Sequence, residues 1–208
     1  MNQPSLVYID ANVFLSYMAG QDADPQQYPF AKAFFTGLPS GKQAGVFSLL
    51  SGLEILDVLR KWKGWEFETL SRMSTQEDHI KHVIEGARER YAEIITEMLA
   101  VPEIRFMQPL HLDITQLLHD ALEILSDVKG SVRFYDSCKI CGRQNNGQKF
   151  LSVHKCVGMQ DVIHVLLAKA MKCDAFVTFD RGFLELLNET RIRPVRIEVL
   201  RPPKSSIR

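Results

Sequence analysis

The stretch Leu6-Val7-Tyr8-Ile9-Asp10 joins a short apolar run to a carboxylate. An apolar run of this length, with β-branched side chains, predicts a buried strand at residues 5–9. A similar run, Ala175-Phe176-Val177-Thr178-Phe179, leads into Asp180. Parallel α/β sheets bind ligands beyond the carboxyl ends of their strands. Asp10 and Asp180 are therefore expected to meet at one edge of a sheet.

Apolar residues at strand and helix spacing alternate along the rest of the chain. Further strands are expected at residues 45–48, 103–108 and 195–200, and helices at 12–20, 30–36, 51–63, 76–100, 113–127, 159–172 and 182–188. This order predicts a single α/β domain over residues 1–208, with a three-layer α/β/α fold and a central, mostly parallel sheet of four to five strands. Residues 64–157 are expected to carry a helical insertion at about 76–100 and an irregular loop at 131–157.

Composition sets the broad class of protein. The 208 residues are 46% hydrophobic, which suffices for one sizeable core, and 25 basic residues balance 25 acidic ones, so net charge does not indicate a nucleic-acid partner. No apolar run approaches the roughly 18 residues of a membrane span. The N-terminal stretch lacks the pattern of a secretory signal, so a cytoplasmic protein is expected, with its cysteines as thiols or metal ligands rather than disulfides.

Two further acids are predicted at the same edge of the sheet. Ser51 is typical of a helix N-cap, and Glu54 follows it at the capping-box position. Asp161 lies in the first turn of the helix at 159–172, where the helix dipole favours a negative charge. Taken singly, each acid also fits a structural role as a cap or turn residue. His164, on the same mostly apolar helix, is expected to be a hydrogen-bonded core residue.

Four carboxylates at one edge predict a metal-dependent enzyme. They would repel one another, so some must stay protonated unless divalent cations lie between them. Mg²⁺ and Mn²⁺ prefer carboxylate oxygens and water, and they promote hydrolysis of phosphodiesters. Asp10, Asp161 and Asp180 are expected to hold one metal ion. Glu54 is expected to complete that site or to position water for a second ion.

Four motifs, in order, resemble those of the PIN-domain nucleases, the family of the VapC-type toxins. The first is Val7-Tyr8-Ile9-Asp10-Ala11-Asn12, and the second runs from Ser48 to Glu54. The third is Asp161 opening a helix that carries Ala168, and the fourth is the strand end Thr178-Phe179-Asp180-Arg181-Gly182-Phe183. Small toxins of the family have the second and third motifs close together, whereas 106 residues separate Glu54 from Asp161 here.

The resemblance implies a PIN-like sheet with an acidic pocket that binds Mg²⁺ or Mn²⁺, and endonucleolytic cleavage, most often of RNA. It implies that Asp10, Glu54, Asp161 and Asp180 are metal ligands or hold metal-bound waters. Asn12, Ser48 and Thr178 would orient them through hydrogen bonds. The implied partners are an RNA substrate, an antitoxin protein and a second copy of the chain. The alternatives are a weakly active or inactive RNA- or protein-binding module of the same fold, and a structure-specific DNA nuclease.

The loop at 131–157 carries two further patterns. Its Cys/His residues are spaced as in a structural zinc site, which would make a zinc-ribbon-like insertion, or they are free thiols in a flexible loop: Cys138, Cys141, His154 and Cys156. Its basic residues would hold substrate phosphates beside the acidic pocket, or they belong to a solvated loop: Arg133, Lys139, Arg143, Lys149 and Lys155.

Overall fold

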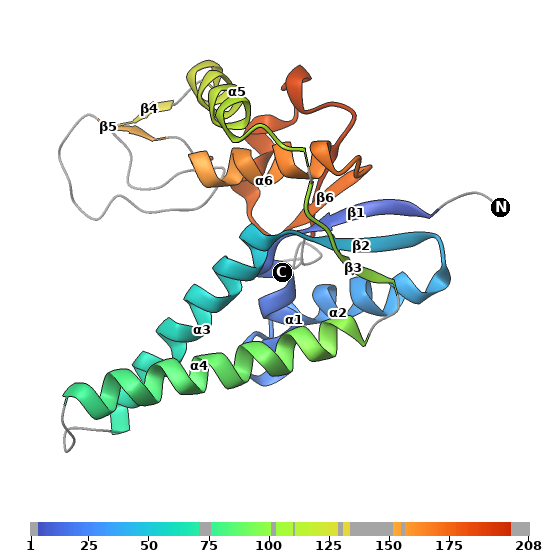
Figure 1. Cartoon of the computed structure of the whole chain (residues 1–208). Helices are drawn as coiled ribbons and strands as arrows, with labels where there is room; N and C mark the ends of the chain where they lie inside the picture. The colour runs from blue at the N-terminus through green and yellow to red at the C-terminus, as the bar shows by residue number, and fades with distance from the viewer. Residues whose placement is uncertain are drawn as a thin grey trace, which may run out of the picture.

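A five-stranded parallel sheet forms the centre of the protein, shown as a computed structural model in Figure 1. The structure describes residues 4–70, 76–100, 103–109, 111–128, 131–133, 152–154 and 157–200. The strands are ordered β3-β2-β1-β6-β7 and every neighbouring pair is parallel: β1 (Ser5–Ile9), β2 (Gln43–Phe47), β3 (Ile104–Phe106), β6 (Ala175–Thr178) and β7 (Arg196–Val199). The predicted α/β/α fold class is confirmed, and the last strand lies at an edge as expected.

Helices connect the strands and cover both faces of the sheet. They are α1 (Ala11–Ala23), α2 (Tyr28–Gly37), α3 (Leu49–Leu70), α4 (Gln76–Leu99), α5 (Ile114–Asp127) and α6 (Met159–Ala170), with 3-10 turns η1 (Leu38–Ser40), η2 (Arg181–Leu186) and η3 (Thr190–Ile192). A separate antiparallel pair joins β4 (Ser131–Arg133) to β5 (Ser152–His154). Across the described ranges, no helix is both long and apolar enough to pass through a bilayer.

Two hydrophobic cores arise because side chains alternate along the strands. Val7 and Ile9 point to the face covered by α1 and α2, where Phe14 and Phe35 pack against them. Tyr8 points to the opposite face, which α5 and α6 cover. Every one of these strand residues is fully buried. The alternation therefore sets three layers and brings a tyrosine hydroxyl into the core beneath α6.

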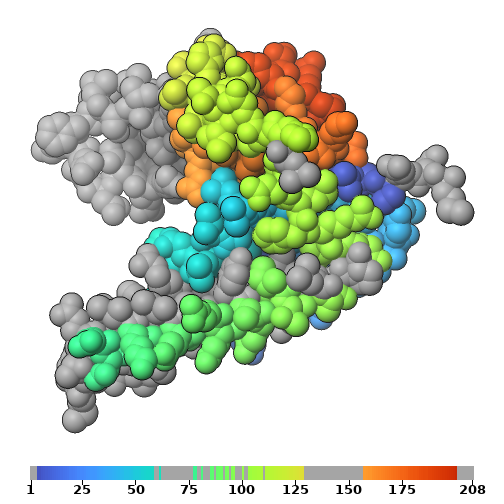
Figure 2. Space-filling model, viewed as in Figure 1, coloured from blue at the N-terminus to red at the C-terminus, as the bar shows by residue number. Residues whose placement is uncertain are grey.

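The long helices α3 and α4 pack side by side and extend away from the sheet, and α4 forms the elongated lower side of the molecule in Figures 1 and 2. α3 runs past the expected end at residue 63 to Leu70. It also begins earlier than expected, at Leu49, so Ser51 is not its N-cap. Ser48, directly before the helix, accepts a hydrogen bond from the backbone N–H of Ser51 (3.3 Å) and takes that role.

Gly45 on β2 is a position where the packing of the sheet requires the absence of a side chain. A Cβ added there would lie 2.7 Å from Cδ1 of Ile9, with Ile104 and Leu38 in contact behind it. Because Ile9 is fully buried, Gly45→Ala should lower the free energy of unfolding by about 1–2 kcal/mol in urea denaturation. Gly37→Ala is the control, since a Cβ at Gly37 meets nothing within 4 Å. Equal stability of the two variants would contradict this packing.

Candidate functional site

The four predicted acids line one pocket of about 500 Å³ at the carboxyl end of the sheet. Asp10 follows β1 and begins α1, Asp180 lies just beyond β6, Glu54 is on α3 and Asp161 is in the first turn of α6. The other lining residues include a fifth acid and several apolar side chains: Ala11, Asn12, Leu15, Leu50, Leu53, Asp57, Gln160 and Phe183. Among the described residues that line the pocket there is no lysine, arginine or histidine.

Asp10 is a nearly buried carboxylate held by two neighbours from the sequence motifs. The Thr178 hydroxyl donates to its Oδ2 (2.6 Å) and in turn accepts from the Asn12 amide (3.0 Å). Asn12 also accepts from the backbone N–H of Phe179 (3.1 Å). Burial raises the pKa of Asp10 to about 6, although Thr178 and the nearby His164 oppose the rise. A carboxylate in this setting binds a proton or a cation more readily than an exposed one.

Asp161 and Asp180 each use one carboxylate oxygen to stabilise the local backbone. Oδ2 of Asp161 accepts from the Gly158 N–H (2.7 Å) at the start of α6, and Oδ1 of Asp180 accepts from the Gly182 N–H (2.6 Å). Burial raises the pKa of Asp161, and the neighbouring Asp180 adds to the effect. The capping role and the pocket role are compatible, because the second oxygen of each residue makes no hydrogen bond to the described part of the chain.

Glu54 differs from the aspartates because neutral and basic side chains contact both of its oxygens. Gln160, on the first turn of α6, donates its amide N–H to Oε1. His164, one turn further along α6, places Nε2 2.9 Å from Oε2. The predicted core role of His164 is therefore accompanied by a contact to a pocket acid. The spacing from Asp161 places His164 near the pocket, but its reach to Glu54 depends on how α3 crosses α6.

The three predicted supporting residues divide between two places. Asn12 and Thr178 lie beside Asp10 as described above. Ser48 is buried and bonds to the Tyr8 hydroxyl (2.5 Å), and within the described residues it makes no hydrogen bond to the four acids. Tyr8 and Gln160 were absent from the predicted site. In the sequence, Tyr8 is typical of a buried strand residue and Gln160 of a residue on the surface of a helix. The sequence around them therefore does not indicate that either residue belongs to the site.

The predicted zinc and phosphate-binding residues lie mostly outside the described residues. These are Cys138, Cys141 and Cys156, together with Lys139, Arg143, Lys149 and Lys155. Arg133 ends β4 opposite Ser152, and His154 ends β5 opposite Ser131. Both assignments therefore stay predictions. Cys173, the remaining cysteine, is buried in the core, and burial raises the pKa of its thiol to about 12.

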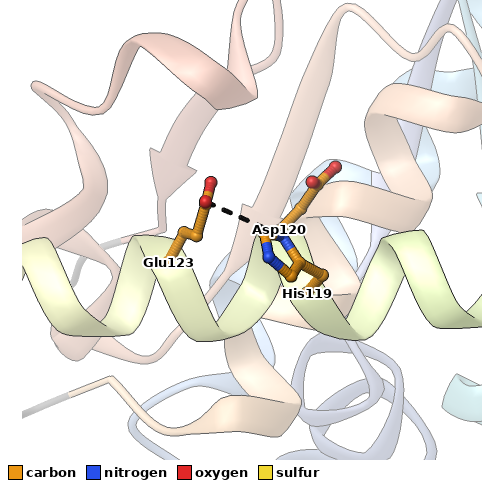
Figure 3. Close-up of side chains that lie close together, drawn as sticks. All are labelled: His119, Asp120 and Glu123. Atoms are coloured by element: carbon orange, nitrogen blue, oxygen red, sulfur yellow. Dashed lines mark ion pairs between the residues drawn. The ribbon is translucent and has the colours of Figure 1, made fainter.

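A second acidic group lies on α5, apart from the pocket (Figure 3). Within the described ranges, His119, Asp120 and Glu123 are the one group of three with ligand atoms all within 4.8 Å of one another. His119 and Glu123 are more than half exposed, Asp120 accepts from Gln116 (2.6 Å), and Glu123 lies 3.9 Å from Arg191. Such clusters are common on solvated helix faces, and we assign this one no function.

The pocket suits a hard divalent cation in charge and in ligand type. It brings together five acids and two amides with no cationic side chain among the described residues of its lining, and oxygen ligands are those that Mg²⁺ and Mn²⁺ prefer. The carboxylates are spaced more widely than the ligand atoms of the α5 group. Binding an ion would therefore require them to rotate inward, as mutually repelling groups do when a cation neutralises them.

Comparisons with known proteins add little. No protein-family model matches the sequence, and no curated protein is significantly similar to it. The chain is similar to one in a crystal structure of VapBC2 from Rickettsia felis bound to a DNA fragment from their promoter, with 11% identity and a TM-score of 0.45, over 93% of this chain and 98% of that chain. A similarity of this degree defines neither the fold nor the function of the present protein.

Thr178 is expected to control both the stability of the pocket and the protonation of Asp10. Thr178→Val would remove the hydrogen bond to Oδ2 of Asp10 and the one from the Asn12 amide N–H at a buried position, which should lower the free energy of unfolding by about 2 kcal/mol. The pKa of Asp10 should rise further, because the hydroxyl now lowers it. Carboxyl ¹³C NMR would measure that pKa. Thr178→Ser keeps the hydroxyl and should leave the pKa of Asp10 unchanged; a rise in both variants would contradict the assigned role.

Proposed function

We propose that this protein is a PIN-type endoribonuclease that uses Mg²⁺ or Mn²⁺ to hydrolyse RNA phosphodiester bonds. The observation that carries the proposal is the pocket itself: four acids from motifs far apart in sequence line it, with no cationic side chain among the described lining residues. A site of that charge repels a phosphate unless a cation lies between them. The motif resemblance supports the same conclusion from the sequence.

Asp10, Asp161 and Asp180 would hold the metal ion, because each keeps one carboxylate oxygen without a hydrogen bond to the described residues. Bound there, the ion would neutralise the phosphate and acidify the attacking water. Thr178 and Asn12 keep Asp10 in place through the hydrogen bonds given above. Glu54 contributes a carboxylate that accepts a hydrogen bond from Gln160 and lies beside His164. It would complete the metal site or position water for a second ion.

RNA is the proposed substrate on the strength of the motif resemblance and of the basic residues in the loop at 131–157. Because the pocket is acidic, phosphates on either side of the cleaved bond need cationic contacts elsewhere. The predicted phosphate-binding residues would supply them. An antitoxin partner and a self-associated dimer are likewise predictions from the resemblance, as is zinc in the loop.

A cleavage assay with matched oligonucleotides tests the proposed function. Labelled single-stranded RNA and DNA of one sequence are incubated with wild type in Mn²⁺ or EDTA. We expect RNA cleavage in Mn²⁺ alone. Asp161→Asn should be about 100-fold slower or worse, because it removes a ligand charge. Asp120→Asn is the matched control: it removes an acid of the α5 group and should leave the rate unchanged.

Other outcomes distinguish the rival functions. Faster cleavage of DNA than of RNA would favour a DNA nuclease. Binding of RNA by wild type without any Mn²⁺-dependent cleavage would favour an inactive binding module. Equal RNA degradation by wild type and Asp161→Asn would mean that the activity does not arise from this pocket, and the proposal would fail.

A further inference from the structure

A chain of buried hydrogen bonds leads from the core to the acidic pocket. The Tyr8 hydroxyl, on β1, lies 2.5 Å from Ser48 Oγ, 3.1 Å from Ser51 Oγ and 2.7 Å from Nδ1 of His164. These residues are nearly or fully buried, and His164 comes from α6, 156 positions away in sequence. Buried polar groups are costly unless they are paired, so a network of this kind needs an explanation other than packing.

The chain ends on Glu54. Nε2 of His164 lies 2.9 Å from Glu54 Oε2, but the N–H direction is too oblique for a regular hydrogen bond. Of the described residues, only Ser16 and Glu103 also have a buried side-chain oxygen or nitrogen left without a hydrogen bond. Alignment of the pair requires Oε2 of Glu54 to move toward the plane of the imidazole ring, where the N–H bond points. Such contacts in ligand-free sites are often poorly aligned and become shorter and straighter when the site fills.

The direction of donation along the chain follows from the protonation of Tyr8. A tyrosine hydroxyl carries its proton at neutral pH, so it can donate one hydrogen bond while its oxygen accepts others. The serines can each donate to the tyrosine oxygen, which leaves the tyrosine O–H free to donate to Nδ1 of His164. A neutral histidine that accepts at Nδ1 carries its proton on Nε2. That is the nitrogen facing Glu54.

We propose that Tyr8 and His164 are positioning residues for Glu54: the tyrosine hydroxyl holds the imidazole in the Nε2–H tautomer, and the imidazole directs the Glu54 carboxylate in the pocket. This inference rests on the proposed function, since it gives a role to a carboxylate of that site. Gln160 donates to the other oxygen of Glu54, so the carboxylate lies between an amide and an imidazole that both come from α6. Neither Tyr8 nor His164 lines the pocket, so each acts through Glu54.

Kinetics of RNA cleavage in Mn²⁺ test the proposed role. Tyr8→Phe and His164→Phe should lower kcat, or raise the Mn²⁺ concentration for half-maximal rate, about 10- to 100-fold, while KM for RNA stays unchanged. His164→Gln should restore most of the loss, because its amide can donate to Glu54. Tyr17 belongs to the other core, where its ring packs at a tilt against Phe35, and Tyr17→Phe should match wild type. No rescue by glutamine, or no loss in Tyr8→Phe, would overturn the proposal.

The ring nitrogens of His164, observed by ¹⁵N NMR in the metal-free protein, give a readout independent of activity. Wild type should show the Nε2–H tautomer, and Tyr8→Phe should shift the population toward Nδ1–H. Glu54→Gln should move the Nε2 signal, whereas Asp113→Asn, at the start of α5 and outside the pocket lining, should not. A Nδ1–H tautomer in wild type would overturn the proposal. If wild type cleaves no RNA, the proposed function fails, yet this measurement still decides whether Tyr8 sets the tautomer facing Glu54.

Discussion

Asp10→Asn is expected to lower the rate of Mn²⁺-dependent RNA cleavage about 1000-fold, on the order of 4 kcal/mol of transition-state stabilisation. Asp10 is the most buried of the four acids and is held rigidly by Thr178, so no neighbour can take its place. The amide keeps the shape of the carboxylate but loses the charge that attracts the cation. RNA binding should be unchanged or tighter, because one source of repulsion toward phosphate is removed. Single-turnover cleavage and fluorescence anisotropy measure the two effects.

Asp113→Asn is the matched control for this change. Asp113 caps α5 by accepting from the N–H groups of Thr115 and Gln116, and asparagine caps helices equally well. Asp113 does not line the pocket, so its variant should keep the wild-type rate. A loss of RNA binding in Asp10→Asn that matches its loss of cleavage would instead indicate that Asp10 contacts the substrate or supports the fold.

The titration of Asp10 is expected to make the free energy of unfolding depend strongly on pH. The pKa of Asp10 is raised from 3.8 to about 6, first by burial, so the folded state binds its proton more tightly than the unfolded chain does. This contribution to stability is complete below pH 3.8 and is lost as the pH rises through 6. The total loss is about 3 kcal/mol, of which about half falls between pH 5 and 7.5.

Asp10→Asn removes this titration, so the variant should be more stable than wild type, by an excess that grows by about 1.4 kcal/mol between pH 5 and 7.5. Urea denaturation in EDTA measures the free energy of unfolding of both proteins at each pH. Subtracting the wild-type value from that of the variant cancels most contributions from other titrating groups. Mn²⁺ at pH 7.5 should stabilise wild type and not the variant. An excess that stays constant between the two pH values would show that Asp10 titrates normally.

The secondary structure of this protein could be predicted because its signals are local. The run at residues 5–9 and the run before Asp180 become β1 and β6, and these two strands pair directly, with Val7 beside Ala175 and Ile9 beside Val177. Parallel pairing then brings Asp10 and Asp180 to one edge. The true extent of α3 was not predictable, because its last turns lie against α4 and not against the sheet.

Sequence periodicity was sufficient to place the five strands of the main sheet, most of the helices and, with them, the four acids, since burial patterns of period 2 and 3.6 depend only on neighbours along the chain. The strands β4 and β5 and the 3-10 form of η2, where a helix at 182–188 was expected, were not predicted. The tertiary structure decided which carboxylate oxygens of the pocket remain without a hydrogen bond. It also decided which buried side chains contact the pocket acids. Tyr8 and His164 lie 156 positions apart and meet only because α6 crosses the sheet above β1. Contacts of this kind depend on the packing of one element on another, and no short stretch of sequence encodes them.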